Sequence, residues 1–301
     1  NFIHKTSLDN KVYSISFDRG FDRKLCQKIA FANKPFNLPS TGITIMPEPS
    51  FSVFTNVLKF LKRIQLIPAA VVCYVNDSKQ IKLSNILKNK GFYTLHYEKI
   101  TKFFDVKENI NIVARAKVPL KTCENSEIIG FRTDLNGKDH FAIIFNEGNK
   151  NYQPLVRIHS QCISGDLLDS LKCDCGSQLS SAIKMLSSSS GVLLYLNQEG
   201  RDIGFVNKLR AYEIQSFGYD TIDANNALGF DDDQRDYSLA AKMLNLLNIG
   251  TIRLITNNPD KKTQLENLEI KILEVIPLKV SVGIHAKKYL ETKKVRSGHK
   301  L

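Results

Sequence analysis

The stretch Arg157-Ile-His-Ser-Gln-Cys-Ile-Ser-Gly-Asp-Leu-Leu-Asp-Ser-Leu-Lys-Cys-Asp-Cys-Gly176 contains three cysteines, the last two separated by one residue. It follows a β-prone run, Leu155 to His159, and precedes a helical pattern. Thiolates are soft ligands that suit zinc, and three of them leave one position of a tetrahedral ion open, as a catalytic site requires. Because Cys173 and Cys175 are too close for opposed strand positions, a turn must direct both at one ion. The stretch predicts a zinc site between a strand and a helix.

The spacing of Cys162, Cys173 and Cys175 favours a catalytic metal site. A structural zinc ribbon usually has two separated Cys-x-x-Cys pairs. Here ten residues separate Cys162 from Cys173, and no fourth cysteine follows Cys175. A structural site completed by His159, and buried thiols without a metal, are open alternatives. A disulfide is disfavoured because the sequence shows no secretory segment and no regular cysteine framework. We therefore expect a cytoplasmic protein.

The charge of the chain is unevenly distributed. The net charge is +12, of which the first 150 residues carry +10 and the remainder +2, so the half with the cysteines is nearly neutral. A basic field attracts polyanions in general. However, the sequence has no helix-turn-helix, zinc-finger spacing or aromatic stacking motif, and no apolar stretch of membrane-spanning length. We expect solvated lysines, no specific nucleic-acid partner and no membrane partner.

The 301 residues are enough for two domains, and a polar junction places the boundary near residue 108. In the first part, apolar spacing predicts a helix over 51–64 and another over 81–89. The run Ala69-Ala-Val-Val-Cys-Tyr-Val75 predicts a short buried strand, and Tyr93 to Tyr97 a second strand. The first part is therefore expected to be mixed α/β.

Strands and helices alternate in the second part. Strands are expected at 128–132, 140–145, 155–159, 191–196 and 251–256, with turns at Asn136-Gly137 and Gly148-Asn149. Helices are expected at 178–186, 205–217 and 238–247, and Asn258-Pro259 predicts an N-cap and first turn of another. The predicted fold class is α+β or α/β, with two domains, 1–107 and 108–301, each a mixed sheet with flanking helices.

Two loops after predicted strands have the features of anion sites. Gln198-Glu-Gly-Arg-Asp-Ile-Gly204 lies before a helix, where main-chain N–H groups and an arginine can meet an anion. Thr256-Asn-Asn-Pro-Asp-Lys-Lys262 offers a helix start, a hydroxyl and the ammonium of Lys261. A Gly-rich turn and an Asn-capped helix with solvated lysines are the ordinary alternatives. Two such loops beside a metal suggest a nucleotide substrate.

Between these loops, Gly229-Phe-Asp-Asp-Asp-Gln-Arg-Asp236 places four carboxylates around one arginine. Crowded carboxylates raise one another's pKa, so we expect one of them to serve as a proton acceptor. The arginine stays charged and can bind phosphate. An acidic surface loop is the alternative.

Together these segments resemble the GTP cyclohydrolase II family over about residues 110–301. The motifs that carry the resemblance, in the family's order, are Arg157-Ile-His-Ser-Gln-Cys, Lys172-Cys-Asp-Cys-Gly, Gln198-Glu-Gly-Arg-Asp-Ile-Gly, Asn207-Lys-Leu-Arg-Ala-Tyr212, Tyr219-Asp-Thr-Ile-Asp-Ala-Asn225, Leu228-Gly-Phe, Arg235-Asp236, Thr256-Asn-Asn-Pro, Tyr289-Leu-Glu-Thr-Lys293 and Gly298-His299.

The resemblance implies a zinc enzyme that opens the imidazole ring of GTP and releases formate and pyrophosphate, the first step of riboflavin biosynthesis. It implies that Cys162, Cys173 and Cys175 hold the zinc ion, that Asp233 is the proton acceptor, and that Arg235 attacks or handles the α-phosphate. The residues implied to line the GTP site are Arg157, Ile158, His159, Ser160, Gln161, Gln178, Glu199, Gly200, Arg201, Thr221, Thr256 and Lys261. Magnesium is expected with the triphosphate, and a homodimer is expected because the family commonly forms one.

Three positions depart from the family's usual pattern. Gln161 stands where Glu is common, Asn197 where Arg is common, and Asp223 where Glu is more frequent near the base. Gln161 keeps hydrogen-bonding capacity but loses a charge, and Asp223 is one methylene shorter than Glu. These changes leave open a nucleotide-binding pseudoenzyme of the same fold with a structural or regulatory role.

The first domain resembles the later half of 3,4-dihydroxy-2-butanone 4-phosphate synthase. The resemblance rests on Ser14-Ile-Ser-Phe-Asp-Arg19, residues 42–47 and Leu66-Ile-Pro-Ala-Ala-Val-Val-Cys73. The family's acidic metal-binding start is missing, its His is replaced by Thr41, and its Glu after the Cys is replaced by Tyr74. Without those groups the enolising chemistry has neither metal nor base. We expect residues 1–107 to be catalytically inactive and to support folding or dimerisation.

Overall fold

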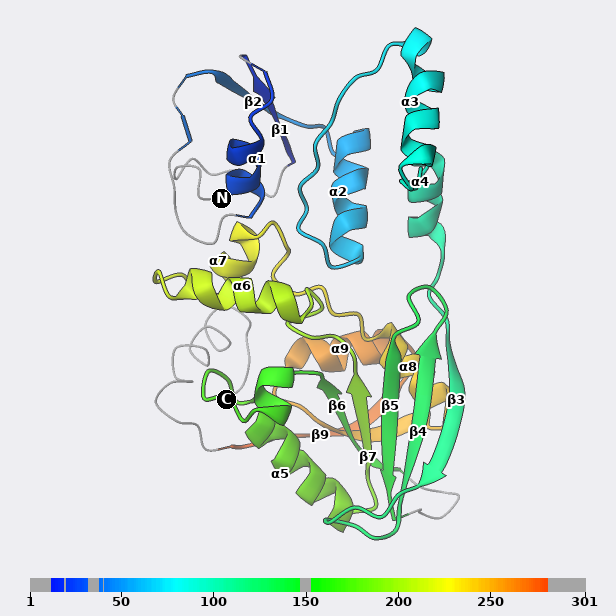
Figure 1. Cartoon of the computed structure of the whole chain (residues 1–301). Coiled ribbons are helices and arrows are strands. Elements are labelled where there is room, and N and C mark those ends of the chain that lie inside the picture. Colours follow the sequence, from blue (N-terminus) through cyan, green and yellow to red (C-terminus); the bar gives the residue numbers. More distant parts are fainter. Residues whose placement is uncertain (1–11, 19, 32–37, 40, 147–152, 281–301) are drawn as a thin grey trace. The chain divides into compact units, whose positions relative to one another are not determined.

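The computed structural model describes residues 12–18, 20–31, 38–39, 41–146 and 153–280 (Figure 1). The chain divides into two compact units. The amino unit comprises residues 1–107 with 227–230, and the carboxyl unit comprises residues 108–226 with 231–301. The predicted turn Gly148-Asn149 and the motifs at 289–293 and 298–299 lie outside the described residues. No helix among the described residues is both long and apolar enough to span a bilayer.

A mixed sheet forms the centre of the carboxyl unit. In the described residues it has seven strands, in the order β3-β4-β5-β7-β6-β8-β9. β3, β4, β5 and β7 pair antiparallel in succession, whereas β7, β6, β8 and β9 pair parallel. The strands are β3 (Ile110–Lys117), β4 (Ser126–Thr133), β5 (Asp139–Phe145), β6 (Leu155–Ser160), β7 (Val192–Leu196), β8 (Thr251–Ile255) and β9 (Lys271–Ile276). Each of the five strands predicted from the sequence is confirmed.

Helices cover both faces of this sheet (Figure 1). Successive side chains of a strand point to opposite faces, so a strand buried on both sides is apolar throughout. In β7, Val192, Leu194 and Leu196 pack in one cluster with α8 (Ser238–Leu246), and Leu193 packs in a second cluster with α5 (Cys175–Ser188). The same alternation in β6 sends Val156 and Ile158 toward α8. The polar side chains between them therefore lie on the face covered by α5.

The predicted helices of the carboxyl unit are present at the expected positions, but some of their ends differ by a few residues from the prediction. Asn258 caps the last one as predicted, because its side chain accepts a hydrogen bond from the Asp260 N–H at 3.0 Å. The helix predicted from residue 178 begins at Cys175, so one cysteine is its first residue and Cys173 lies two positions before it. The helical elements are η1 (Ile163–Leu167), a π-helical turn, α5 (Cys175–Ser188), α6 (Phe205–Gln215), α7 (Thr221–Ala227), α8 (Ser238–Leu246) and α9 (Pro259–Asn267).

The amino unit has little sheet. Its described strands, β1 (Tyr13–Phe17) and β2 (Ile43–Pro47), form a two-stranded antiparallel pair, so the predicted mixed sheet is wrong for this part of the chain. Its helices are α1 (Arg23–Ala30), α2 (Val53–Arg63), α3 (Asp77–Asn89) and α4 (Tyr97–Asp105). α2 and α4 pack together through Phe60 and Phe103, whose ring centroids are 5.3 Å apart.

The two strands predicted in the amino unit are also wrong. The run Ala69 to Val75 has no regular structure, and Val71 is 68% and Tyr74 90% exposed. The second predicted strand ends where α4 begins, at Tyr97. Strand backbone groups need a neighbouring strand to pair with, and neither run has one among the described residues. A short apolar run therefore does not by itself decide between a strand and a loop.

Candidate metal centre and substrate site

The three cysteines converge where β6 ends and α5 begins. Cys162 follows β6, the π-helical turn η1 comes next, and a turn then leads to Cys173 and to Cys175 at the start of α5. Two glycines make this approach possible. A Cβ on Gly165 would lie 2.8 Å from Cys175 Cβ and 3.0 Å from Cys173 Sγ, and a Cβ on Gly176 would lie 2.3 Å from the Gly165 carbonyl oxygen. Any larger residue at either position would push η1 away from α5.

The sulfur positions fit a zinc ion. The three sulfur atoms lie within 4.8 Å of one another, and the Cys162 and Cys173 sulfurs are 3.7 Å apart. A tetrahedron with zinc–sulfur bonds of about 2.3 Å requires a sulfur–sulfur distance of about 3.8 Å. Among the described residues, no His, Cys, Asp or Glu side chain joins this cluster as a fourth ligand. A site completed by His159 is therefore wrong, and the donor set is that of an ion with an open position.

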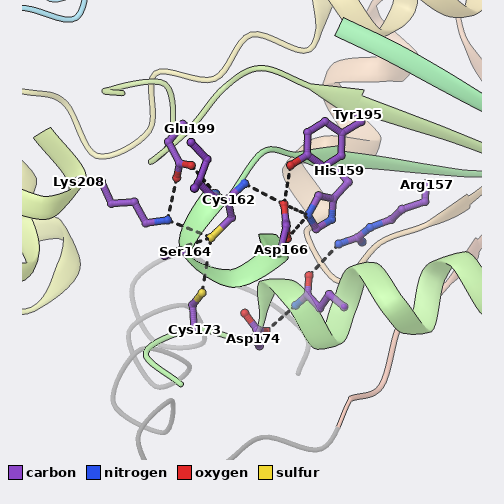
Figure 2. Close-up of polar contacts among 12 residues, drawn as sticks. Arg157, His159, Cys162, Ser164, Asp166, Cys173, Asp174, Tyr195, Glu199 and Lys208 are labelled. Carbon is purple, nitrogen blue, oxygen red and sulfur yellow. Dashed lines mark hydrogen bonds and ion pairs between the residues drawn. The ribbon is translucent and has the colours of Figure 1, made fainter. Parts of the chain in front are cut away.

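Cys162 is held by contacts from three other elements (Figure 2). Its main-chain N–H donates to Asp166 Oδ2 at 2.9 Å, and the next N–H, that of Ile163, donates to Glu199 Oε2 at 2.6 Å. The Lys208 ammonium donates to Cys162 Sγ at 3.0 Å and to Glu199 Oε1 at 2.7 Å. Cys162 is only 4% exposed. The first ligand of the candidate metal site is thus fixed at its backbone and at its sulfur.

The pKa values of the three thiols shift in opposite directions because the thiols share hydrogen bonds. Hydrogen bonds from Cys173 and Cys175 lower the pKa of the Cys162 thiol, and the positive charge of Lys208 lowers it further. The same bonds raise the pKa of Cys173 and of Cys175, and burial adds to that rise. Cys162 is therefore the thiol whose pKa is lowered, and it is the one that Lys208 contacts.

Asp166 organises the polar side chains on the α5 face of the sheet. Its carboxylate lies 3.1 Å from His159 Nε2 and accepts a hydrogen bond from the Tyr195 hydroxyl at 2.9 Å (Figure 2). His159 is 3% exposed, and its Nδ1 has no hydrogen-bond partner among the described residues. Burial is the largest influence on its pKa and lowers it, while Asp166 acts in the opposite direction. The imidazole therefore faces Asp166 and not the sulfur atoms.

Arg157 is buried beside α5. Its guanidinium donates to the Ile255 carbonyl at 3.2 Å and to Gln178 Oε1 at 2.8 Å, and Gln178 in turn donates to Asp174 Oδ2 at 2.5 Å. Its Nε has no hydrogen-bond partner among the described residues. Burial lowers the pKa of Arg157. A buried guanidinium with an unused donor is a group suited to an anion.

The predicted anion loops lie at one edge of the sheet. Because β7, β6 and β8 are parallel, their carboxyl ends meet there, and ligands of open α/β sheets bind at such an edge. The 198–204 loop follows β7 and reaches the candidate metal site through Glu199, which accepts from the Ile163 N–H next to Cys162. Lys261, in the first turn of α9 after β8, donates to the Ile158 carbonyl at 3.0 Å and is 6% exposed. The structure therefore brings the cysteines and both loops to the same edge.

In the acidic segment 229–236, the pKa of Asp233 shifts in the direction opposite to the prediction. Arg235 binds Asp233 through its Nε, at 2.8 Å from Oδ1, and through its terminal nitrogen. Burial raises the pKa of Asp233, but the hydrogen bonds and charge of Arg235 outweigh it, so this pKa is lowered. The expectation that crowding raises the pKa is wrong for Asp233, because its nearest neighbour is a cation. Asp233 is ionised and paired at neutral pH.

Tyr237 lies close to Arg235 and to Lys261. The Lys261 ammonium lies 5.0 Å and the Arg235 guanidinium 5.8 Å from the centre of its ring. The Tyr237 hydroxyl is buried and has no hydrogen-bond partner among the described residues, and burial raises its pKa. The field of Arg157 also acts on this tyrosine. Arg201 acts on it in the same way, so four cations influence one buried phenol.

The remaining predicted GTP-site residues occupy varied positions. The Ile158 side chain is fully buried in the core, so this residue meets the site through its carbonyl oxygen, which accepts from Lys261. Arg201 donates to the Asp232 carbonyl at 2.9 Å, and the Thr256 hydroxyl accepts from the Asn258 N–H at 3.1 Å. Ser160 ends β6 with its hydroxyl buried and unpartnered among the described residues. Gln161 follows β6, Gly200 has φ 64° in the 198–204 loop, and Thr221 begins α7.

The sequence did not point to three residues that shape this site: Asp166, Tyr195 and Lys208. Asp166 lies between two ligands in the cysteine stretch, but its spacing carries no signature of its own. Lys208 is 46 positions from Cys162, and a lysine on a helix is ordinarily a solvated one. The resemblance places Lys208 inside a family motif, Asn207 to Tyr212, which is the signal that singles it out.

Comparisons with known proteins match the carboxyl unit. The family model described as GTP cyclohydrolase II matches residues 111–277. The chain is 49% identical over 268 residues to GTP cyclohydrolase-2 of Azospirillum brasilense, which covers 86% of this chain and 67% of that protein. It is 47% identical over 178 residues to GTP cyclohydrolase-2 of Buchnera aphidicola, which covers 59% of this chain and 92% of that protein.

A third relative has a different description. The chain is 40% identical over 240 residues to the riboflavin biosynthesis protein RibBA of Endomicrobium trichonymphae, covering 78% of this chain and 60% of that protein. The chain thus spans only about three fifths to two thirds of these two longer relatives. Both matches are longer than the segment 108–301, so the similarity extends into the amino unit. The match over 111–277 and the identities to these relatives establish that the chain belongs to the GTP cyclohydrolase II family.

Proposed function

We propose that this chain is a zinc-dependent GTP cyclohydrolase II that hydrolyses GTP to formate, pyrophosphate and a diaminopyrimidine product, at the start of riboflavin biosynthesis. The observation that carries the proposal is the cluster of Cys162, Cys173 and Cys175, with sulfurs spaced for zinc and no fourth His, Cys, Asp or Glu ligand among the described residues. Family membership supplies the reaction and the substrate. Magnesium accompanies the triphosphate in this proposal as part of the substrate.

A zinc ion held by the three cysteines supplies Lewis acidity, which activates water at neutral pH. The hydrolysis needs water to add at C8 of guanine, a C–N bond of the imidazole ring to open, and a further water to release formate. The protein's part is to hold C8 beside the sulfur cluster. The carboxyl ends of β6 and β7 flank that position, since Cys162 follows one strand and Glu199 follows the other.

Release of pyrophosphate needs separate chemistry at the α-phosphorus, where water breaks the bond to the β-phosphate. Arg157, Arg235 and Lys261 supply positive charge around Tyr237, and guanidinium and ammonium groups neutralise phosphate oxygens. Asp233 is the proposed proton acceptor. Its lowered pKa keeps it ionised, and Arg235 fixes its orientation. Its strong pairing also means that it accepts a proton most readily once phosphate draws Arg235 away.

The amino unit contributes support and not chemistry in this proposal. Thr41 and Tyr74 occupy positions where the resemblance to 3,4-dihydroxy-2-butanone 4-phosphate synthase requires His and Glu. Tyr74 is 90% exposed in a segment without regular structure, so it forms no enclosed site. We propose that this unit is catalytically inactive, and that the protein works as a homodimer.

The direct test is formate release from GTP by the full chain with and without a chelator. Formate that appears with zinc and disappears with the chelator is the expected result. Zinc-loaded protein that binds GTP without producing formate would identify a nucleotide-binding pseudoenzyme instead. Restoring Gln161→Glu and Asn197→Arg would then be expected to raise activity.

Two substitutions separate metal binding from proton transfer. Cys173→Ser should lose zinc and formate release together, because it removes one of the sulfur ligands. Asp233→Ala should keep zinc and lose about 10²- to 10⁴-fold in turnover, the usual contribution of a general base. If Asp233→Ala loses zinc as fully as Cys173→Ser does, the proposed role of Asp233 is wrong.

A third substitution tests the phosphate step. Arg235→Ala should reduce pyrophosphate release more than formate release.

A further inference from the structure

Lys208 makes an unusual contact for a lysine. It lies on α6, 46 positions from Cys162, yet its ammonium donates to Cys162 Sγ at 3.0 Å (Figure 2). Its side chain is 11% exposed and carries its charge into the interior, where an unpaired charge is strongly unfavourable. Glu199, with a side chain 5% exposed, accepts a second hydrogen bond from it at 2.7 Å. The pair is therefore charge-balanced before the sulfur is considered.

The local sequence makes room for this side chain. α6 begins after Gly204, whose φ of 86° suits glycine, and the Lys208 N–H closes the first turn onto the Gly204 carbonyl at 3.0 Å. A Cβ on Gly200 would lie 3.1 Å from Lys208 Cβ, so glycine there leaves space for the lysine stem. Tyr212, one turn further along α6, has its ring 5.7 Å from the Lys208 ammonium. Backbone and neighbours direct the ammonium toward the cysteine cluster.

The contacts form a closed ring around the first metal ligand. The Ile163 N–H donates to Glu199, Glu199 accepts from Lys208, and Lys208 donates to the sulfur of the residue before Ile163. Glu199 alone satisfies the need of a buried lysine for a counter-charge. A second hydrogen bond, aimed at the sulfur atom, is therefore a feature of the metal ligand and not a by-product of the ion pair.

We propose that Lys208 is a positioning residue of the metal centre, which orients the Cys162 sulfur toward the other two sulfurs and stabilises its thiolate form through a hydrogen bond. A hydrogen bond from an ammonium to a thiolate is charge-assisted, and such bonds are roughly twice as strong as neutral ones. The hydrogen bond also takes up one lone pair of the sulfur, which limits the directions left for the metal. This inference deepens the proposed function, because it assumes the same metal site.

The test uses Co²⁺ as a spectroscopic probe and zinc competition with a chelating indicator on the full chain. Lys208→Met keeps the length of the side chain and removes its charge and donor. The sulfur then holds its electrons less tightly, so the thiolate-to-cobalt charge-transfer band should shift to longer wavelength. Zinc affinity should fall about 10- to 100-fold, as is usual when a group that orients a metal ligand is removed. Lys184→Met, at an exposed position of α5, is the matched control and should change neither quantity.

Two further variants keep the test decisive if Lys208→Met leaves Glu199 unpaired or does not fold. Lys208→Met with Glu199→Gln removes both buried charges, so a spectral shift that persists there belongs to the contact with sulfur and not to an unpaired Glu199. Lys208→Arg keeps a charged donor and should restore most of the zinc affinity, even if Lys208→Met fails to fold. Folded Lys208→Met or double-mutant protein with a wild-type cobalt spectrum and zinc affinity would overturn the inference. Wild-type protein that binds zinc but yields no formate would instead contradict the proposed function and leave the positioning role standing.

Discussion

In the carboxyl unit, apolar runs such as Val192 to Leu196 become strands packed on both faces, whereas in the amino unit the run Ala69 to Val75 lies exposed without regular structure. Both runs are short and apolar in the sequence, and both were predicted to be buried strands. The difference is that the first has strands to pair with on both sides and helices to pack against. Among the described residues 12–107, only Thr55 and Ile100 are buried. The cysteine cluster belongs to the unit with a core, and a core is what holds its sulfur atoms to within tenths of an ångström.

The largest expected effect of this difference is on stability. Leu194 in β7 is fully buried in the cluster beside α8, so Leu194→Ala should lower the free energy of unfolding of the carboxyl unit by about 2–5 kcal/mol. Urea unfolding followed by far-UV circular dichroism measures this. Leu66→Ala, at a 52% exposed position of the amino unit, is the control and should change the free energy by at most about 0.5 kcal/mol. Equal effects at the two positions would contradict the contrast between the units.

The sequence predicted what local patterns and family motifs can specify. The buried strands of the carboxyl unit, the Asn258 cap and the convergence of the three cysteines follow from apolar runs, side-chain chemistry and spacing. What it could not specify depends on neighbours distant in the chain. Apolar character did not reveal that Ala69 to Val75 lacks a pairing strand, and charge crowding did not reveal that Asp233 is paired with Arg235.

The buried polar groups of the candidate site were the hardest to foresee. Glu199 was expected to line the GTP site, yet both of its carboxylate oxygens accept hydrogen bonds from the protein, from Lys208 and from the Ile163 N–H. A motif identifies which residues matter without saying whether they contact the ligand or orient the residues that do. That distinction requires the distances.

His140 provides a pH-dependent test of the same comparison. Its Nδ1 accepts the Asn197 N–H at 3.1 Å, and the residue is 1% exposed. Burial, with a smaller contribution from Lys138, lowers its pKa from 6.5 to about 4. The unfolded state therefore binds the proton more tightly, so stability from this group is complete above about pH 6.5 and is lost as pH falls toward 4. The loss amounts to roughly 3 kcal/mol.

His140→Asn should flatten the dependence of the carboxyl unit's unfolding free energy on pH between about 6.5 and 4. The measurement is urea unfolding at a series of pH values, with the wild-type and variant curves subtracted so that the carboxyl groups common to both cancel. His96→Asn, at an exposed position of the amino unit, serves as the control. An unchanged pH slope in His140→Asn would show that this imidazole is not held neutral by burial.

A smaller effect is expected at Gly165, where close packing against the cysteine side chains holds the candidate metal site together. An alanine Cβ there would meet Cys175 Cβ at 2.8 Å and the Cys162 sulfur at 3.1 Å, so η1 must shift away from α5. We expect Gly165→Ala to weaken zinc binding at least about tenfold, a cost of about 1.4 kcal/mol, measured by competition with a chelating indicator. Gly250→Ala has open space around the added methyl and should bind zinc normally. Normal zinc binding by both variants would mean that the cysteine loop is looser than its packing indicates.

The smallest effect is expected at Val72, in the exposed run of the amino unit. Val72 is 52% exposed and lies in a segment without strand or helix, so Val72→Ala should change the free energy of unfolding by at most about 0.5 kcal/mol. Val192→Ala is the matched substitution in β7, where the side chain is fully buried, and should cost at least about 1.5 kcal/mol. Amide hydrogen exchange followed in both segments reports the two effects separately. Strong protection of residues 69–75, together with a loss of unfolding free energy at Val72 as large as that at Val192, would show that a partner covers this run in solution. The contrast between the two units would then hold only for the isolated chain.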